Sequence, residues 1–213
     1  MRSLWQSQLI SACIVVLLHP LNALAFDGRL LDAGTGKPAA GVWVFGQWQV
    51  GGGFVISHSA CVLAVTRAND KGEFTLVAGD GFLGRLFGQS NRTGVYTYKP
   101  GYMDRLPHAE TTNDYLIEPD TRPILKRLEY LSYLLGITDC GTQYVLDHKA
   151  ALLPLYRAIH EEAVGIAKTR REQQVLVSIA SSLDLLEIGP DAASAKAKRT
   201  SQMLHDQIRR GEQ

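Results

Sequence analysis

The segment Gly41 to Phe45 places tight limits on the fold because it is apolar on both faces of a single strand. Side chains alternate across a strand, so Val42 and Val44 share one face while Trp43 and Phe45 share the other. A strand of this kind is normally covered on both sides. The segment therefore predicts a β-sandwich whose outer face needs a second cover, and the leucine-rich helices expected later in the chain are the nearest candidate.

Further segments on either side of this strand have the pattern of short strands and turns. A strand is expected over residues 27–32, a turn at Thr35 to Pro38, and a second turn at Asn69 to Gly72. Residues 73–78 then alternate, with Phe74, Leu76 and Ala78 expected to face inward, and residues 95–98 form a final strand. The first hundred residues are therefore predicted to be all-β after the leader.

The order of these pieces resembles the carboxypeptidase regulatory-like domain, a transthyretin-like Greek-key β-sandwich. The matching pieces are a Gly-x-Leu-x-Asp opening, a Thr-Gly-Lys-Pro turn, a Gly-Val-x-Val strand, an Asp-x-Gly-x-Phe hairpin and a Pro-Gly-Tyr end, at residues 28–32, 35–38, 41–44, 70–74 and 100–102. The match covers about residues 26–102. Domains of this family usually serve as non-catalytic modules, so the resemblance implies a scaffold or binding role and identifies no active site.

The character of the sequence changes near residue 123. Residues 107–122 are polar and contain prolines, and we expect a linker there. Helical spacing of leucines then predicts a helix from Pro123 to Gly136, a second helical region at about 145–169 broken near Pro154, and a third at 172–188. A fourth runs to about Arg210. The predicted fold is α+β, with a sandwich at 26–106 and three to four helices of no recognised family within 123–213.

The first 25 residues have the pattern of a secretory signal. Arg2 supplies the charge, residues 9–18 form the apolar run, and residues 23–25 offer a small-x-small site with cleavage after Ala25. The alternatives are a retained anchor, for which the apolar run is short, and lipid attachment at Cys13. The expected location is periplasmic or secreted, with no integral membrane span once the signal is removed.

Charge and cysteine content narrow the classes of partner. There are 22 Lys and Arg residues against 21 Asp and Glu, and loss of Arg2 with the leader balances them, so no nucleic-acid footprint is expected. An oxidising compartment favours a disulfide between the two mature cysteines, Cys61 and Cys140. The alternative for each is a buried free thiol.

The histidines give little support for catalysis. His160-Glu161-Glu162 resembles half of a zinc-protease motif, but the residue four positions after His160 is Val164, so a solvated charged face is favoured. No cofactor and no metal site are predicted. The alternative function is a hydrolase-type enzyme with a site between the sandwich and the helices, which requires His148, His160 and Glu161 to converge.

Four aromatic residues are the candidate binding residues: Trp43, Trp48, Tyr96 and Tyr98. Exposed on one face, they would form a stacking platform for a saccharide or peptide. The competing interpretation places Trp43 in the core. The function predicted from the sequence is a secreted or periplasmic, non-catalytic binding or assembly protein with an envelope protein, saccharide or peptide as its partner.

Overall fold

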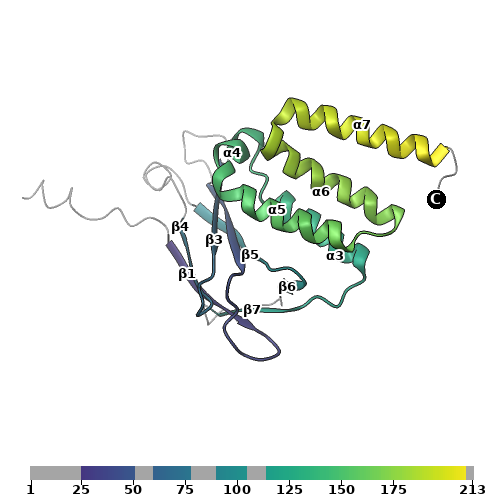
Figure 1. Cartoon of the computed structure of the whole chain (residues 1–213). Coiled ribbons are helices and arrows are strands. Elements are labelled where there is room, and N and C mark those ends of the chain that lie inside the picture. Colours follow the sequence, from purple (N-terminus) through teal and green to yellow (C-terminus); the bar gives the residue numbers. More distant parts are fainter. Residues whose placement is uncertain (1–24, 51–59, 78–89, 105–113, 210–213) are drawn as a thin grey trace, which may run out of the picture.

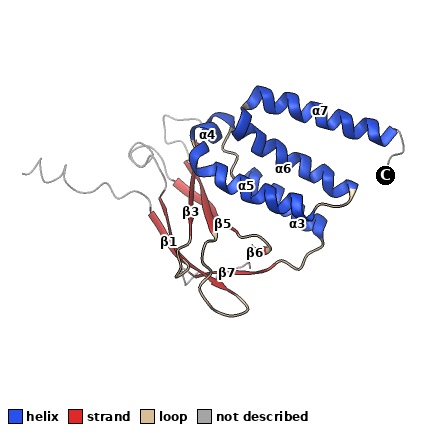
Figure 2. Ribbon diagram, viewed as in Figure 1, coloured by secondary structure: helices blue, strands red, loops and turns tan. Residues whose placement is uncertain are grey.

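The structure, a computed structural model, describes residues 25–50, 60–77, 90–104 and 114–209. Within these residues the chain is α+β: seven strands form two small sheets, and five helices follow them in the sequence (Figure 1). The helices gather on one side of the strands (Figure 2). The signal peptide and the expected cleavage after Ala25 fall at or before the first described residue, and the structure does not test them.

The first sheet has four strands in the order β4-β1-β7-β6. These strands are β1 (Ala25–Asp32), β4 (Glu73–Val77), β6 (Tyr102–Asp104) and β7 (Asp114–Pro119). Strand β1 pairs antiparallel with β4 and parallel with β7, and β6 pairs antiparallel with β7.

Strand β7 corrects the prediction of a linker over residues 107–122. Tyr115 and Ile117 are buried in alternation along it, at 7% and 1% exposure. This alternation is short and lies among polar residues and prolines, so its pattern gave a weak signal. Pairing with β1 and β6 makes the segment a strand.

The second sheet has the order β3-β2-β5 and is antiparallel throughout. Its strands are β2 (Trp43–Val50), β3 (Ala60–Arg67) and β5 (Ser90–Tyr98). The pairing of β2 with β5 shifts its register between Gln47 and Trp48. The central strand of this sheet is therefore β2, the segment that the sequence predicts to be covered twice.

One hydrophobic core lies between the two sheets. Val44 of β2 and Val42, which directly precedes that strand, pack there with side chains of the first sheet, among them Leu30, Phe74 and Leu76. All five are at most 3% exposed. As expected, Phe74 and Leu76 face inward and alternate with exposed residues along β4.

A glycine is required where the chain turns between β3 and β4. Gly72 has a φ of +75°, and a Cβ placed on it would lie 2.3 Å from the carbonyl oxygen of Leu30. Asn69 shapes the same turn, because its Oδ1 accepts hydrogen bonds from the backbone N–H groups of Lys71 and Glu73 at 2.9 and 3.0 Å. The backbone N–H of Leu30 in turn donates to the carbonyl of Gly72. The turn is thus tied directly to β1.

The helices follow the strands in an almost continuous series. They are α3 (Ile124–Ile137), α4 (Thr142–Asp147), α5 (Lys149–Ile166), α6 (Arg170–Ile188) and α7 (Pro190–Arg209). The described region contains five helices, whereas three to four were expected. The second predicted helical region is two helices, α4 and α5, which meet at His148, and it begins at Thr142 and not at about residue 145. Pro154 does not break it, since it lies inside α5.

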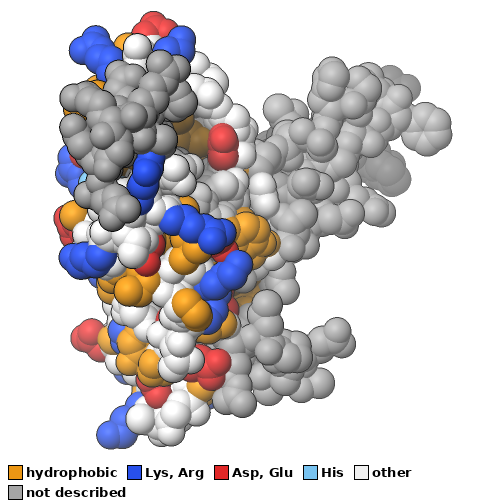
Figure 3. All heavy atoms as spheres, turned by 90° about the vertical axis from the view of Figure 1, so that its right-hand side faces the viewer, with side chains coloured by type: hydrophobic (Ala, Val, Ile, Leu, Met, Phe, Trp, Pro, Cys, Tyr) orange, Lys and Arg blue, Asp and Glu red, His pale blue; other side chains and the backbone are white. Residues whose placement is uncertain are grey.

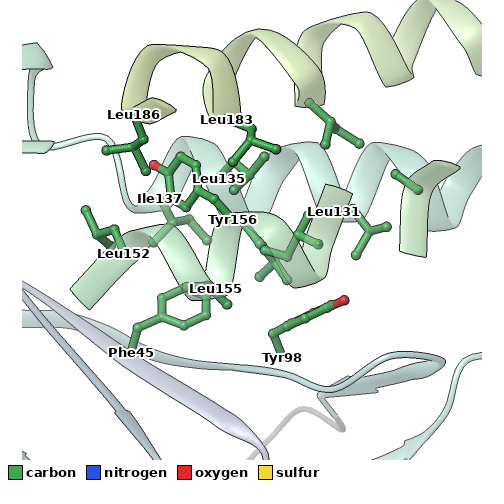
Figure 4. Close-up of a cluster of buried hydrophobic side chains, with 14 of the residues drawn as sticks. Phe45, Tyr98, Leu131, Leu135, Ile137, Leu152, Leu155, Tyr156, Leu183 and Leu186 are labelled. Carbon is green, nitrogen blue, oxygen red and sulfur yellow. The ribbon is translucent and has the colours of Figure 1, made fainter. Parts of the chain in front are cut away.

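A second, larger core joins the helices to the outer face of the β3-β2-β5 sheet. Phe45 and Tyr98 project from the sheet toward leucines of the helices, as Figure 4 shows, and Trp43 is half-buried against the same cluster. The buried helical residues include Leu131, Leu135, Leu152, Leu155, Leu183 and Leu186. The prediction that Trp43 and Phe45 face away from the sandwich toward the helices is therefore confirmed.

Candidate functional site

The structure places the predicted aromatic residues differently from one another. Tyr98 is 1% exposed, and its hydroxyl donates to the carbonyl of Ala158 at 2.7 Å. The Tyr96 ring stacks on Phe45 with centroids 5.8 Å apart. Trp43 is half-buried, and the side chain of Trp48 lies outside the described part of the chain. Tyr98 is a core residue with no free face for a ligand, because the helical layer covers it.

The residues of the alternative, catalytic hypothesis lie apart. His148 sits at the start of α5, where its ring stacks on Tyr144 with centroids 4.0 Å apart. His160 follows it by twelve residues of the same helix, which corresponds to about 18 Å along the axis. The histidines therefore do not converge. Among the described residues, no group of three or more His, Cys, Asp or Glu side chains is placed to hold a metal ion.

Glu162 is not part of a solvated charged face, as the sequence suggested, but half of a buried ion pair. Arg127 of α3 is 5% exposed, and its Nε and Nη2 donate to the two carboxylate oxygens of Glu162 on α5 at 2.8 and 2.9 Å. This is the two-pronged geometry that guanidinium and carboxylate groups favour. The His160-Glu161-Glu162 segment thus contributes a side chain to the interior.

The same ion pair binds the strands. The backbone N–H of Gly101 donates to Glu162 Oε1 at 3.1 Å, and the Tyr98 hydroxyl lies 3.0 Å from Oε2. Arg127 also donates to the carbonyl of Tyr102. The Pro-Gly-Tyr turn singled out in the sequence is therefore held against α3 and α5 by charged groups.

Asp120 completes this buried ionic cluster at the end of β7. Its Oδ2 accepts from Arg127 Nη1 at 3.1 Å, and its Oδ1 accepts from Arg122 Nε at 2.8 Å. The hydrogen bond from Arg122 holds the pKa of Asp120 down at about 2, with the charges of both arginines assisting. Every charged group of the cluster thus has a partner within it, which makes it a structural joint between sheets and helices.

Asp104 forms a smaller polar contact between β6, β5 and α3. Its carboxylate accepts from the hydroxyl and the backbone N–H of Thr97 and from the Tyr130 hydroxyl, the last at 3.3 Å. Burial raises the pKa of Asp104 to about 6 despite these donors. Asp104 is therefore an ionisable group, at the contact of β5, β6 and α3, whose protonation changes near pH 6.

An open hollow of about 420 Å³ lies between α3 and α6. We call it the α3–α6 groove. Its half-buried base includes Leu125 and Val175, and exposed polar groups form its rim. The lining residues are Leu125, Glu129 and Ser132 of α3 with Arg171, Gln174, Val175 and Ser178 of α6. The groove thus combines apolar contact area with polar side chains that face solvent.

The groove begins beside the first turn of α6. Thr169 and Glu172 form a capping box there: Thr169 Oγ1 accepts from the backbone N–H of Glu172, and the Glu172 carboxylate accepts from the backbone N–H groups of Lys168 and Thr169 at 2.8 Å each. Glu172 is therefore fully engaged. Arg170 and Arg171 stand exposed beside it.

Sequence reasoning missed the groove, because its residues are unremarkable individually and come from two helices 46 positions apart, as the spacing of Leu125 and Arg171 shows. One signal was present in the sequence. Arg170 and Arg171 occupy the first turn of a helix, where acidic residues are preferred. An unfavourable charge at a helix start is a reason to look for a partner outside the chain.

Cys140 takes part in a disulfide and packs at the edge of the helix-facing core. The side chain of Cys61, its predicted partner, lies outside the described residues. The predicted Cys61–Cys140 pairing therefore stays a prediction.

Comparison with protein-family models, with curated proteins and with solved structures found no match to this chain.

Proposed function

We propose that this chain is an exported, non-catalytic binding or assembly protein that contacts its partner through the α3–α6 groove. One core joins the two sheets to each other, and a second joins the helices to the β3-β2-β5 sheet through Phe45 and Tyr98. The buried ionic cluster around Arg127 links the strands to α3 and α5 as well. Such a body presents its outer helices as a rigid platform. Rigid presentation limits the conformational entropy lost when a partner binds.

The observation that carries this proposal is the contrast between the interior and the groove. Inside, the charged groups of Arg127, Glu162 and Asp120 are paired with one another. On the rim of the groove, Arg171 has no ion pair or hydrogen bond with any described residue, although Glu129 is paired with Lys126 at 2.7 Å. Polar groups available to a partner, next to apolar area, are the features of a recognition surface.

The strand region supports the proposal as a scaffold. We propose that the strand region, whose residues 26–102 carry the pattern described above, is a carboxypeptidase regulatory-like domain of the transthyretin-like, Greek-key type. The turn at Gly72, which excludes a side chain, fits the glycine of the Asp-x-Gly-x-Phe hairpin in that pattern. Modules of that family are usually attached to other functional parts, and here the attached part is the helical layer.

Export is proposed from the leader pattern at residues 1–25. In the described part of the chain, no helix has the length and apolar character needed to cross a bilayer. An envelope protein is the partner class that best suits a periplasmic or secreted chain with an open helical groove.

Site-specific photo-crosslinking in the exported, full-length protein tests this function. A crosslinking residue at Ser132 should yield a discrete covalent adduct with one partner, and the additional change Ser178→Trp should abolish it by filling the groove. The matched control carries the crosslinker at Lys71, which is exposed in the turn between β3 and β4. The proposal would be contradicted if the crosslinker at position 71 gave the same adduct as the crosslinker at position 132. It would also be contradicted if the adduct from position 132 still formed in the presence of Ser178→Trp.

A further inference from the structure

The charges around the start of the α3–α6 groove do not fit the needs of the isolated chain. The aligned peptide dipoles make the N-terminal end of a helix positive, so a cation there is destabilising. Lys168, Arg170 and Arg171 nevertheless surround the start of α6, and all three are exposed. The nearby carboxylates do not neutralise them, because Glu172 caps the helix and Glu129 binds Lys126.

These three cations have no carboxylate partner among the described residues. Arg171 lines the groove, and Lys168 and Arg170 lie close to it in the sequence. The apolar lining residues Leu125 and Val175 are half-buried. The face of the molecule on which α3 and α6 begin carries apolar side chains interspersed with Lys and Arg side chains and with several Asp and Glu side chains (Figure 3). Positive charge beside an apolar channel is complementary to a partner segment that is apolar on one side and acidic next to it.

We propose that the groove binds an acidic amphipathic helix of a partner protein, an inference that rests on the proposed binding function. The helix would lay its apolar stripe over Leu125 and Val175 and place its acidic residues beside Lys168, Arg170 and Arg171. This is the helix-in-groove mode of recognition, in which apolar residues at helical spacing anchor the contact.

The shape of the groove suits a helix because its lining includes small side chains. Ser132 of α3 and Ser178 of α6 both line the hollow, and small residues allow a third helix to approach closely. Nucleic acid is a poor alternative occupant, because the chain as a whole is near neutral, with a formal net charge of +1.

The test uses two designed peptides of about 20 residues, long enough to span the groove as a helix. Both carry leucines at helical spacing; one has glutamates beside this stripe, and the other has lysines at the same positions. Fluorescence anisotropy with the full mature protein should show the glutamate peptide binding about tenfold or more tightly than the lysine peptide at low salt. Raising the salt to about 0.5 M should narrow this difference, since screening shortens the reach of the charges.

Three variants locate the binding. The double variant Arg170→Glu/Arg171→Glu reverses the charges and should make the lysine peptide bind more tightly than the glutamate peptide. Ser178→Trp should lower the affinity for the glutamate peptide about tenfold or more. Lys71→Glu, a charge reversal in the remote turn between β3 and β4, should leave the affinities for both peptides unchanged. Circular dichroism and thermal unfolding establish that each variant is folded, and all four altered residues are exposed.

The proposal is overturned if the two peptides bind equally, if neither binds, or if Ser178→Trp has no effect on the glutamate peptide. The crosslinking experiment separates this result from failure of the proposed function. If Ser132 still captures a partner that Ser178→Trp blocks, the binding role stands and the acidic helix is wrong as its occupant. If neither experiment gives a signal that depends on the groove, both ideas fail.

Discussion

The hydroxyl of Tyr144 in α4 lies 2.7 Å from the backbone N and 3.2 Å from the backbone O of Leu63 in β3. It accepts a hydrogen bond from that N–H and donates one to that carbonyl. Strand β3 is an edge of its sheet, and edge strands expose unpaired backbone groups on which other strands can assemble. One helical side chain therefore satisfies both backbone groups of an edge residue.

Removing that hydroxyl should weaken the fold without disturbing the packing of the ring. We expect Tyr144→Phe to lower the free energy of unfolding by about 1–2 kcal/mol, because two backbone groups of Leu63 lose their partner. Urea unfolding measures the change, and hydrogen exchange should show faster exchange at the Leu63 amide. Tyr102→Phe is the matched control, since the Tyr102 hydroxyl has no hydrogen bond to any residue that the structure describes. Equal effects of the two changes would contradict the role of Tyr144.

The buried pair of Arg127 and Glu162 should be much more sensitive to change than a surface pair. Arg127→Leu leaves the buried carboxylate of Glu162 without its guanidinium and removes one of the two arginine partners of Asp120, and we expect a loss of about 3–5 kcal/mol. Arg157→Leu removes the arginine of an exposed pair with Glu187 and should cost less than about 1 kcal/mol.

A double-mutant cycle sharpens this comparison. If Arg127 and Glu162 act on each other, Arg127→Leu combined with Glu162→Leu should destabilise the protein by less than the sum of the two single changes. Strict additivity in urea unfolding would show that the pair is not coupled.

Two glycines with positive φ should respond differently to alanine. At Gly72 the new Cβ would lie 2.3 Å from the Leu30 carbonyl oxygen, whereas at Gly101 it would meet nothing within 4 Å. Gly101→Ala should therefore cost only the left-handed backbone strain, about 1–2 kcal/mol. Gly72→Ala should cost clearly more in thermal or urea unfolding, because the turn must also move away from β1.

The pKa of Asp104 gives stability a pH dependence of unusual sign for a carboxylate. Because burial raises its pKa to about 6 from the ordinary value of 3.8, the folded protein binds more protons than the unfolded chain between these values. The contribution of this group to stability therefore falls as pH rises from about 4 to about 6, and is constant above that window. Comparing urea unfolding of wild type and Asp104→Asn across this window isolates the effect. A difference between the two proteins that does not change with pH would show that Asp104 is not the group responsible.

The predicted disulfide between Cys61 and Cys140 would join β3 to the segment between α3 and α4. It closes a loop of about 80 residues, for which chain entropy gives at most about 4.5 kcal/mol. We expect no free thiol in the unfolded, unreduced mature protein and a lower melting temperature after reduction. Labelling of two thiols per mature chain would contradict the bridge, and so would peptide mapping that joins Cys140 to another partner.

Periodicity predicted the parts of the fold that repeat over many residues. The helix-facing orientation of Phe45 followed from strand alternation, and α3 and α6 followed from leucine spacing. Pro154 misled the prediction of a break because the helix continues through it: the proline removes one backbone hydrogen bond from α5, and the packing of its neighbours offsets that loss. Leu152 and Leu155, which flank it closely, are fully buried.

Features that depend on contacts between distant residues were not predictable in this way. Glu162 is buried because Arg127 pairs with it, and Arg127 lies 35 positions earlier in the sequence. The residues around Glu162 alone therefore do not reveal its burial. The burial of Tyr98, one of the four candidate binding residues, was not predictable for the same reason: nothing in the alternation of Tyr96 and Tyr98 indicates that a helix will lie across Tyr98. The α3–α6 groove likewise exists only after the helices pack together.

The β3-β2-β5 sheet has a core on each of its two faces, and this has a consequence for synthesis. The chain emerges from its N-terminus, so β2 is complete long before Leu152 and Leu155 of α5 arrive to cover its outer face. Until then the aromatic side chains on that face remain uncovered, a condition that promotes aggregation. A chaperone that shields this sheet until α5 has been made would therefore be most needed for nascent chains that are stalled or truncated before that helix.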